Sequence, residues 1–290
     1  MHQPSPTRDV LVLSGGASRG AVQVGMMRAL VERGVRPAAY VGTSVGALNA
    51  AFLAGTGPSD STYPAALADR VRVLGQHWSR IQGRDVFPGS HWTRIGHVVR
   101  HPASLYSSDG LLRLVRSWAP AHRLEDLPVP VRVVTTRLET SDAVYHDRGD
   151  LQTLLLASTA LPSIFDPVRL MGEDGPETHV DGGIADLVPL AGAPSLAPTR
   201  VFVLDASVPA RLRRVRTPID VLLASLAVSM RVRPTVALPG VEVVHLTAPD
   251  LGVRMHDFSR TLEHVALGYR AACEVLGPAG QDHPGRTVAA

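Results

Sequence analysis

Ser44 is the side chain best placed for nucleophilic chemistry, because it lies at the centre of Gly42-Thr43-Ser44-Val45-Gly46. Residues 38–41 before it predict a short strand, and residues 45–53 after it predict a helix. A strand-to-helix reversal this sharp holds the serine in a strained conformation, and the flanking glycines leave room for the turn and for an exposed Oγ. Ser44 would also lie at a helix N-terminus, where backbone N–H groups favour negative charge. The spacing predicts a nucleophile elbow, a pattern that alone is weak.

A glycine-rich loop follows a predicted strand at 10–13 and precedes a predicted helix that ends near Gly34. Its residues are Gly15, Gly16, Ala17, Ser18, Arg19 and Gly20. Consecutive backbone N–H groups of such a loop can point at the oxyanion that forms when a serine attacks an ester carbonyl. The alternative is a dinucleotide site. However, Gly-Gly-x-x-x-Gly differs from Gly-x-Gly-x-x-Gly, and the elbow begins where the acidic ribose contact would be expected.

A candidate base is Asp181, which with Gly182 and Gly183 follows a predicted hairpin over residues 167–180. A carboxylate within hydrogen-bond reach can take the proton of a serine hydroxyl, although an aspartate with a pKa near ~3.9 is a weak base. Burial would raise that pKa, and the glycines would allow close backbone approach. Asp-Gly-Gly by itself is more often a plain turn. His179 would face the same side of the strand, so a Ser-His pairing stays open, although a surface or core histidine is favoured.

Strands alternate with helices along the chain, which favours an α/β fold with a mostly parallel central sheet in three α/β/α layers. Further strands are predicted at 130–136 and 201–204, and a further helix at 151–158. The expected organisation is a flexible N-terminus at 1–9, a single catalytic domain at 10–280 with a cap or insertion at about 56–110, and a frayed C-terminal tail at 281–290.

Composition excludes several other chemistries. All 29 basic residues are arginine, so Schiff-base and pyridoxal chemistry, a Ser-Lys dyad and a lysine-bearing P-loop lose their key residue. The single cysteine, Cys273, rules out an internal disulfide and a multi-cysteine metal site. His97 and His101 have helical spacing, but no nearby carboxylate completes a site, so no metal is expected. A net charge of +3 does not indicate nucleic acid as a partner.

The chain shows no signal peptide and no run of 18 apolar residues, which predicts a soluble, cytoplasmic protein. Residues 77–106 combine tryptophan with arginine, a composition suited to peripheral contact with a membrane interface. A partly buried cap with solvated arginines explains the same composition equally well. The pattern predicts no oligomeric state.

Four blocks in order resemble the patatin-like phospholipases: Gly15-Gly16 to Gly20, Gly42 to Gly46, Ala157 to Val168, and Asp181-Gly182-Gly183. The resemblance spans residues 10 to about 205. It implies a Ser44–Asp181 dyad without a catalytic histidine, and an oxyanion hole in the loop at 15–20. The chain departs from many relatives at Ala17, where they have a third glycine; a positive φ there would strain alanine by about 1–2 kcal/mol.

The resemblance implies an acyl-ester hydrolase that acts on lipids through an acyl-Ser44 intermediate and needs no cofactor. Arg19 would then add positive charge at the oxyanion hole or bind a lipid phosphate. An acyltransferase using the same acyl-serine is an alternative, as is a catalytically idle protein that binds membrane surfaces. An α/β-hydrolase triad fits less well, since in that fold several strands normally precede the nucleophile.

Overall fold

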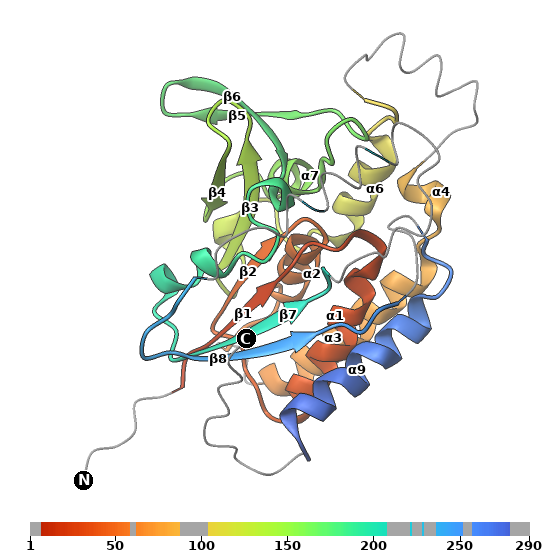
Figure 1. The fold of residues 1–290 in the computed structure, drawn as a ribbon, viewed down its shortest axis with the longest axis vertical. Coiled ribbons are helices and arrows are strands. Elements are labelled where there is room, and N and C mark those ends of the chain that lie inside the picture. The colour runs from red at the N-terminus through yellow and green to blue at the C-terminus, as the bar shows by residue number, and fades with distance from the viewer. Residues whose placement is uncertain are drawn as a thin grey trace.

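The protein is an α/β fold built on one mixed sheet (Figure 1). The computed structural model describes residues 7–58, 62–87, 104–207, 221, 228, 236–251 and 257–278. Five strands run parallel in the order β3-β2-β1-β7-β8, and β4, β5 and β6 add antiparallel pairs at one end. The strands are β1 Asp9–Leu13, β2 Ala39–Thr43, β3 Val131–Arg137, β4 Asp142–His146, β5 Val168–Gly172, β6 Gly175–Asp181, β7 Arg200–Asp205 and β8 Glu242–Thr247.

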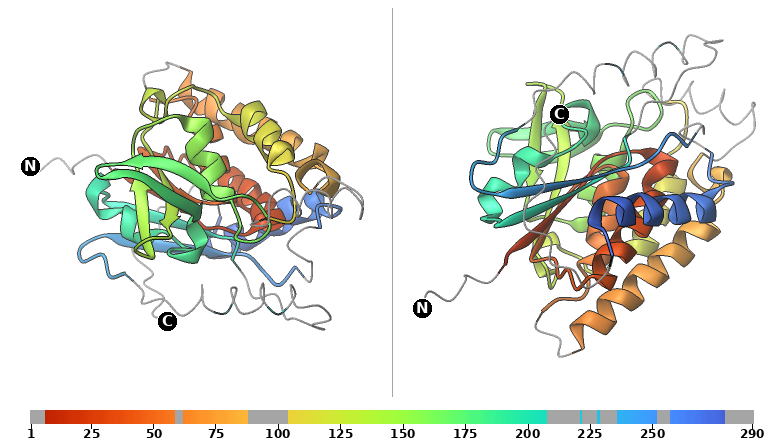
Figure 2. Two further views of the ribbon diagram at one scale, coloured as in Figure 1. Left: turned by 90° about the horizontal axis from the view of Figure 1, so that it is seen from above. Right: turned by 60° about the horizontal axis from the view of Figure 1, so that its bottom comes forward.

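The longer helices pack on one face of the sheet (Figure 2). They are α1 Ala21–Glu32, α2 Val45–Leu53, α3 Tyr63–Arg80, α6 Asp109–Trp118, α7 Leu151–Thr159 and α9 Thr261–Leu276. Buried side chains of all six join the larger hydrophobic core, together with Leu11 and Leu13 of β1. Because successive side chains of a strand point to opposite faces, Val10 and Val12 belong instead to a smaller core on the other face.

Short 3-10 turns cover the second face within the described part of the chain. The turns η4 Leu190–Gly192 and η5 Pro194–Leu196 place Leu190, Ala193 and Leu196 against this smaller core. Proline and glycine interrupt this stretch, which keeps its helical segments short. The predicted α/β class with a mostly parallel sheet is confirmed.

The predicted strands at 10–13, 38–41, 130–136 and 201–204, the hairpin and the helix at 151–158 all form. The elements β4, β8 and α6 were not predicted. In the expected cap, α3 buries Leu67, Leu74 and Trp78 in the main core, and α4 Gly83–Val86 follows it. Residues 88–103, which include His97 and His101, lie outside the described residues, as do 1–6 and the tail at 281–290.

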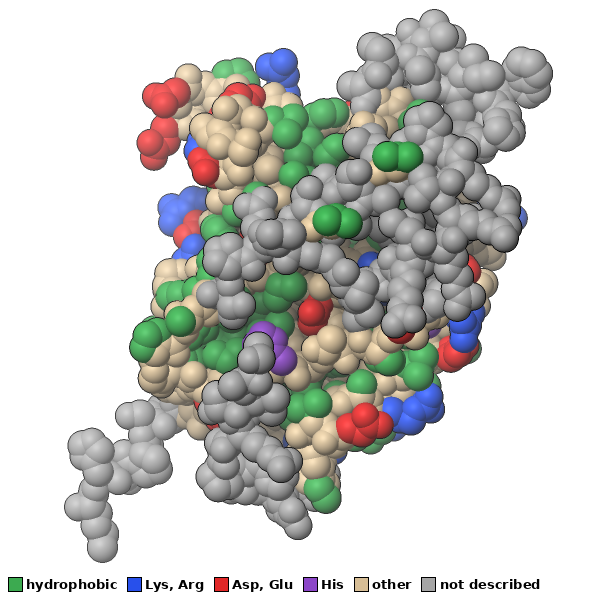
Figure 3. All heavy atoms as spheres, in the orientation of Figure 1, with side chains coloured by type: hydrophobic (Ala, Val, Ile, Leu, Met, Phe, Trp, Pro, Cys, Tyr) green, Lys and Arg blue, Asp and Glu red, His purple; other side chains and the backbone are tan. Residues whose placement is uncertain are grey.

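No described helix combines the length and the apolarity that spanning a membrane requires. The β5–β6 hairpin projects from the sheet and carries Glu173 and Asp174 at its exposed turn, where Figure 3 shows acidic side chains gathered.

Candidate active site

Strand β3 brings the ends of β2 and β6 together along one edge. Thr43, the last residue of β2, pairs with Val134, and Asp181, the last residue of β6, pairs with Thr135. β6 thus continues along β3 where β2 stops. The residue after Thr43 is Ser44, so two side chains 137 positions apart in the sequence meet at adjacent positions of a third strand.

Ser44 occupies the predicted strand-to-helix corner and has a positive φ of 54°. The corner is tight: a Cβ added at Gly46 would lie 2.3 Å from the carbonyl oxygen of Leu13, so only glycine fits there. Ser44 is 9% exposed, and its Oγ donates a hydrogen bond of 2.6 Å to Oδ2 of Asp181. The structure therefore places the candidate nucleophile within direct reach of a carboxylate.

Asp181 is buried, with 2% of its surface exposed. Its Oδ1 accepts a hydrogen bond of 2.8 Å from the N–H of Gly183. Burial raises the pKa of Asp181 to about 6, while the hydrogen bonds from Ser44 and Gly183 oppose that rise. Gly182 allows the close fit, since a Cβ there would lie 2.3 Å from the carbonyl oxygen of Val134. The carboxylate is thus a stronger base than an exposed aspartate.

Ser158 of α7 ties the elbow to the sheet. Its Oγ accepts a 2.9 Å hydrogen bond from the N–H of Ser44 and donates one of 2.6 Å to the carbonyl oxygen of Val134. The backbone N–H of the nucleophile is therefore occupied. Ser158 lies within the block Ala157 to Val168, but no role was predicted for it, because nothing in the sequence places a residue of α7 beside Ser44.

The glycine-rich loop lies against the nucleophile, and a Cβ added at Gly15 would lie 3.5 Å from Cβ of Ser44. The N–H of Gly15 donates to Leu187 O at 2.9 Å, and that of Arg19 donates to Gly16 O at 3.1 Å, so neither is a free donor. Within the described residues, the N–H groups of Gly16 and Ala17 have no acceptor. Gly16 and Ala17 are therefore the candidate oxyanion donors of the loop.

The orientation of those donors follows from peptide planarity. In a trans peptide the C=O and N–H groups point in opposite directions. Gly15 O accepts a hydrogen bond from Ser14 Oγ at 2.9 Å, and Gly16 O accepts one from the N–H of Arg19. The N–H groups of Gly16 and Ala17 therefore point away from these bonded carbonyls. Two neighbouring donors of this kind can bind a developing oxyanion.

Ala17 has a φ of 51°, the left-handed conformation that strains alanine. The side chain of Arg19 is 9% exposed, and its Nε lies 3.5 Å from Gly16 O. Arg19 is thus held against the backbone of its own loop.

An apolar pocket that opens to solvent extends from Ser44, and Ala17 and Val45 also line it. Its other walls come from α2, α3, α6 and the segments around them: Leu48, Trp78, Ile81, Val86, Phe87, Leu111, Leu114, Trp118, Thr159, Leu161, Phe165 and Phe258. Trp78 is 2% exposed, so this tryptophan of the segment at 77–106 forms pocket wall and not outer surface. An apolar lining of this kind suits apolar groups beside the serine.

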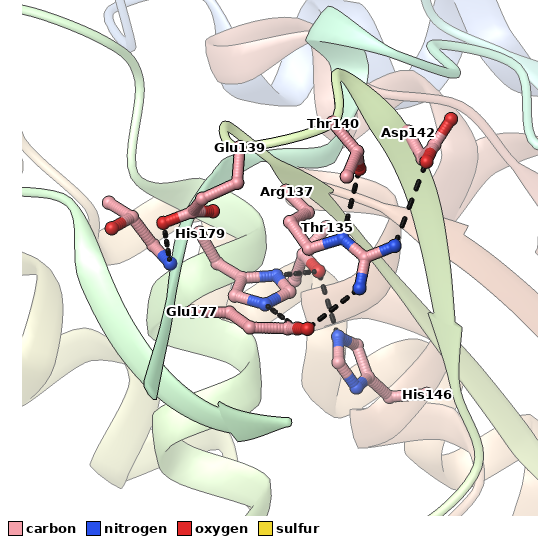
Figure 4. Close-up of polar contacts among 9 residues, drawn as sticks. Thr135, Arg137, Glu139, Thr140, Asp142, His146, Glu177 and His179 are labelled. Atoms are coloured by element: carbon pink, nitrogen blue, oxygen red, sulfur yellow. Dashed lines mark hydrogen bonds and ion pairs between the residues drawn. The ribbon is translucent and has the colours of Figure 1, made fainter. Parts of the chain in front are cut away.

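His179 is buried, and its ring nitrogens bond to Thr135 and Glu177 (Figure 4). Its Nδ1 is 2.8 Å from Thr135 Oγ1, and its Nε2 is 3.3 Å from a carboxylate oxygen of Glu177. His146 shares the same threonine hydroxyl at 2.8 Å, and burial lowers the pKa of His146 to about 4. Both ring nitrogens of His179 have partners, so the structure does not form the Ser-His pairing. The described side chains include no metal-binding group of three His, Cys, Asp or Glu residues.

Comparison with known proteins identifies the family of this chain. Residues 11–194 match the family model described as Patatin-like phospholipase, and the chain belongs to that family. It is similar to an uncharacterized NTE family protein of Mycobacterium bovis, with 27% identity over 188 residues that cover 64% of this chain and 46% of that protein. It is also similar to patatin-like phospholipase domain-containing protein 7 of Mus musculus, with 28% identity over 197 residues, 67% of this chain and 13% of that protein.

The matched region thus covers less than half of either relative. Among solved structures, the crystal structure of VipD from Legionella pneumophila aligns with a TM-score of 0.47 and 17% identity, over 94% of this chain and 67% of that chain.

Replacing Ala17 by glycine tests the loop conformation. We expect Ala17→Gly to raise the free energy of unfolding by about 1 kcal/mol, because relief of ~1–2 kcal/mol of left-handed strain exceeds the entropy that glycine adds to the unfolded chain. Ala68→Gly, at an exposed position inside α3, is the matched control and should lower it by about 1 kcal/mol. Denaturant unfolding measures both, and a similar loss in the two variants would contradict the positive φ.

Proposed function

We propose that this protein is a serine acyl-ester hydrolase that acts on lipids through a dyad of Ser44 and Asp181. The observation that carries the proposal is the 2.6 Å hydrogen bond from Ser44 Oγ to a buried carboxylate at the end of an apolar pocket. Membership of the patatin-like phospholipase family supports the same activity.

The reaction begins when Asp181 accepts the hydroxyl proton of Ser44 and Oγ attacks the ester carbonyl carbon. The carbonyl oxygen becomes an oxyanion and accepts hydrogen bonds from the N–H groups of Gly16 and Ala17. The intermediate collapses, the C–O bond to the alcohol breaks, and the protonated Asp181 gives its proton to the leaving oxygen. This step leaves an acyl-Ser44 ester.

Water completes the cycle. Asp181 takes a proton from the water molecule, the hydroxide oxygen attacks the acyl carbon, and the bond to Ser44 Oγ breaks as Oγ recovers the proton. The released product is a carboxylic acid. The chemistry uses only side chains and backbone of this chain, so the proposed reaction requires no cofactor.

The pocket supports a lipid acyl chain as the substrate group. Each methylene that leaves water for apolar surroundings contributes about 0.8 kcal/mol, so a pocket lined by leucine, tryptophan and phenylalanine favours longer acyl chains over acetate. Among the described residues that line it, none is charged. The pocket therefore favours esters of fatty acids over esters of charged acids.

Removal of either dyad member tests the mechanism. Ser44→Ala and Asp181→Asn should each lower kcat for a nitrophenyl butyrate ester by at least about 10²-fold, since one variant loses the nucleophile and the other the base. Circular dichroism checks folding, and His179→Ala is the comparison. Substantial activity in Asp181→Asn together with loss in His179→Ala would assign the base to histidine.

A fluorophosphonate probe and product analysis complete this experiment. Labelling that depends on Ser44 would exclude a catalytically idle protein. Acyl esters formed on added alcohols, in place of free acid, would favour an acyltransferase.

The raised pKa of Asp181 predicts the pH dependence. Because the base must be ionised, kcat/KM for a non-ionising ester should fall about tenfold per pH unit below a midpoint near pH 6. A midpoint near pH 4, or no dependence between pH 5 and 8, would contradict this assignment.

Stability gives a second readout that needs no activity. The folded carboxyl keeps its proton up to about pH 6, whereas the unfolded one loses it near 3.8, so the unfolding free energy falls as pH rises between these values. This loss, roughly 3 kcal/mol, should be absent in Asp181→Asn.

Narrowing the pocket should change the preference for acyl chain length. Leu114 is half-buried and lines the pocket, so Leu114→Trp should lower the ratio of kcat/KM for octanoyl over acetyl esters by about tenfold or more, because excluded methylenes each lose ~0.8 kcal/mol of binding. Leu112→Trp lies on the same helix outside the pocket lining and is the control. An equal ratio in both variants would place the acyl chain elsewhere.

A further inference from the structure

Three polar side chains form a connected chain inside the core, next to the glycine-rich loop. Gln23 of α1 is fully buried, Asn49 of α2 is 1% exposed and Trp78 of α3 is 2% exposed. None of them takes part in the proton transfers proposed above. Buried amides are costly unless their hydrogen bonds are satisfied, so their partners indicate their role.

Asn49 holds the end of the loop. Its Nδ2 donates to Gly20 O at 3.1 Å and to Gln23 Oε1 at 2.8 Å, and its Oδ1 accepts from Trp78 Nε1 at 2.9 Å. Three helices and the last carbonyl of the glycine-rich loop therefore meet at one amide group.

Gln23 holds the start of the loop. Its Nε2 donates to Ser14 O at 2.9 Å and to Leu204 O at 3.0 Å. Ser14 follows β1 and Leu204 belongs to β7, so one side-chain amide joins the carboxyl ends of two neighbouring strands to α1. The carbonyls at both ends of the loop are thus bonded to the same Gln23–Asn49 pair.

This arrangement controls where the loop's N–H groups point. The Ser14–Gly15 peptide is held at both sides, because its C=O accepts from Gln23 and its N–H donates to Leu187 O. The N–H groups of Gly16 and Ala17, for which the described part of the chain supplies no acceptor, follow immediately. A planar peptide cannot turn its N–H without moving its C=O, so anchoring the loop ends limits rotation of the donors between them.

Asn49 also connects the loop to the pocket, through Trp78. The indole of Trp78 lines the pocket, and a Cβ added at Gly20 would lie 2.8 Å from its ring. Trp78 also stacks on Phe258, another pocket residue, with ring centroids 6.2 Å apart. The pocket wall and the end of the loop are therefore joined through Asn49.

We infer that Gln23 and Asn49 are positioning residues for the oxyanion hole, which orient the N–H groups of Gly16 and Ala17 through the carbonyls of Ser14 and Gly20. The inference rests on the proposed function. It requires that loss of either amide lowers transition-state stabilisation more than substrate binding, since the oxyanion exists only after attack.

The test uses the full chain with Gln23→Met and Asn49→Leu, which remove the amides and keep most of the side-chain volume. Reactive sites are counted by complete labelling with a fluorophosphonate probe, and kcat is expressed per labelled site with nitrophenyl butyrate as substrate. Misplacing oxyanion donors should lower kcat per site by about 10- to 100-fold, with KM changed by less than about threefold. The double variant should be little worse than either single variant, because the two amides act as a unit.

Tyr63→Phe is the matched control. Tyr63 is 3% exposed and donates to Pro37 O at 3.2 Å, so the variant also removes a buried hydrogen bond to a backbone carbonyl, away from the loop. Its kcat per site should equal that of the unmodified protein. Partial unfolding lowers the number of labelled sites and leaves kcat per site unchanged, which separates a structural role from positioning.

Values of kcat per site within twofold of the unmodified protein in both amide variants would overturn the inference. If either variant fails to fold, Trp78→Phe replaces it, since that change removes the N–H that Asn49 accepts. Because it also shrinks the pocket wall, its kcat per site is compared with that of Trp118→Phe, which shortens another tryptophan of the same wall. A further fall of about 3- to 10-fold in Trp78→Phe supports the inference, and equal values in the two variants overturn it. If the unmodified protein neither hydrolyses esters nor labels at Ser44, the proposed function fails instead.

Discussion

The organisation of the site depends on one constraint: a single edge of β3 is shared by two strands that arrive from different parts of the chain. β2 pairs with β3 up to Val134, and β6 takes over at Thr135. β2 ends at Thr43, one residue before Ser44, and β6 ends at Asp181. Ser44 and Asp181 therefore meet where β6 replaces β2 as the neighbour of β3. The hydrogen bonds of Ser158 to Ser44 and Val134 lock this junction from the helical side. Displacing β6 by one residue would turn the Asp181 side chain to the other face of the sheet.

The site also concentrates backbone strain, and the surrounding hydrogen bonds hold it in place. Ser44 and Ala17 both have positive φ, a conformation that L-residues adopt at a cost. Hydrogen bonds fix the backbone around Ala17. The carbonyl groups that accept them belong to Ser14, Gly15, Gly16 and Gly20. Asp181 is held in an unfavourable state as well, because burial removes water from its carboxylate and raises its pKa to about 6. Strain, bonded carbonyls and desolvation therefore come together around Ser44, which lines the pocket with Ala17.

The pocket is not a separate module, since its walls belong to the main core. Helix α3 buries Leu67 and Leu74 between the other helices and then supplies Trp78 to the pocket. The edge-to-face contact of Trp78 with Trp118, with centroids 5.5 Å apart, links α3 to α6 in the same way. The residues that wall the pocket therefore also belong to the core, and Asn49 reaches this shared wall through the indole N–H of Trp78.

The sequence by itself determined the local chemistry: the Ser44 corner, the glycine-rich loop, the Asp181 turn, the family, and the buried strands of an α/β sheet. These are short-range patterns in which residue type and spacing restrict the backbone directly. The distance between Ser44 and Asp181 was not determined in this way, because it depends on which strands pair with β3 and in what register. The bonding of His179 to Thr135 and Glu177, the role of Ser158 and the Gln23–Asn49 pair were also decided only by tertiary structure, since each joins side chains from elements far apart in the chain.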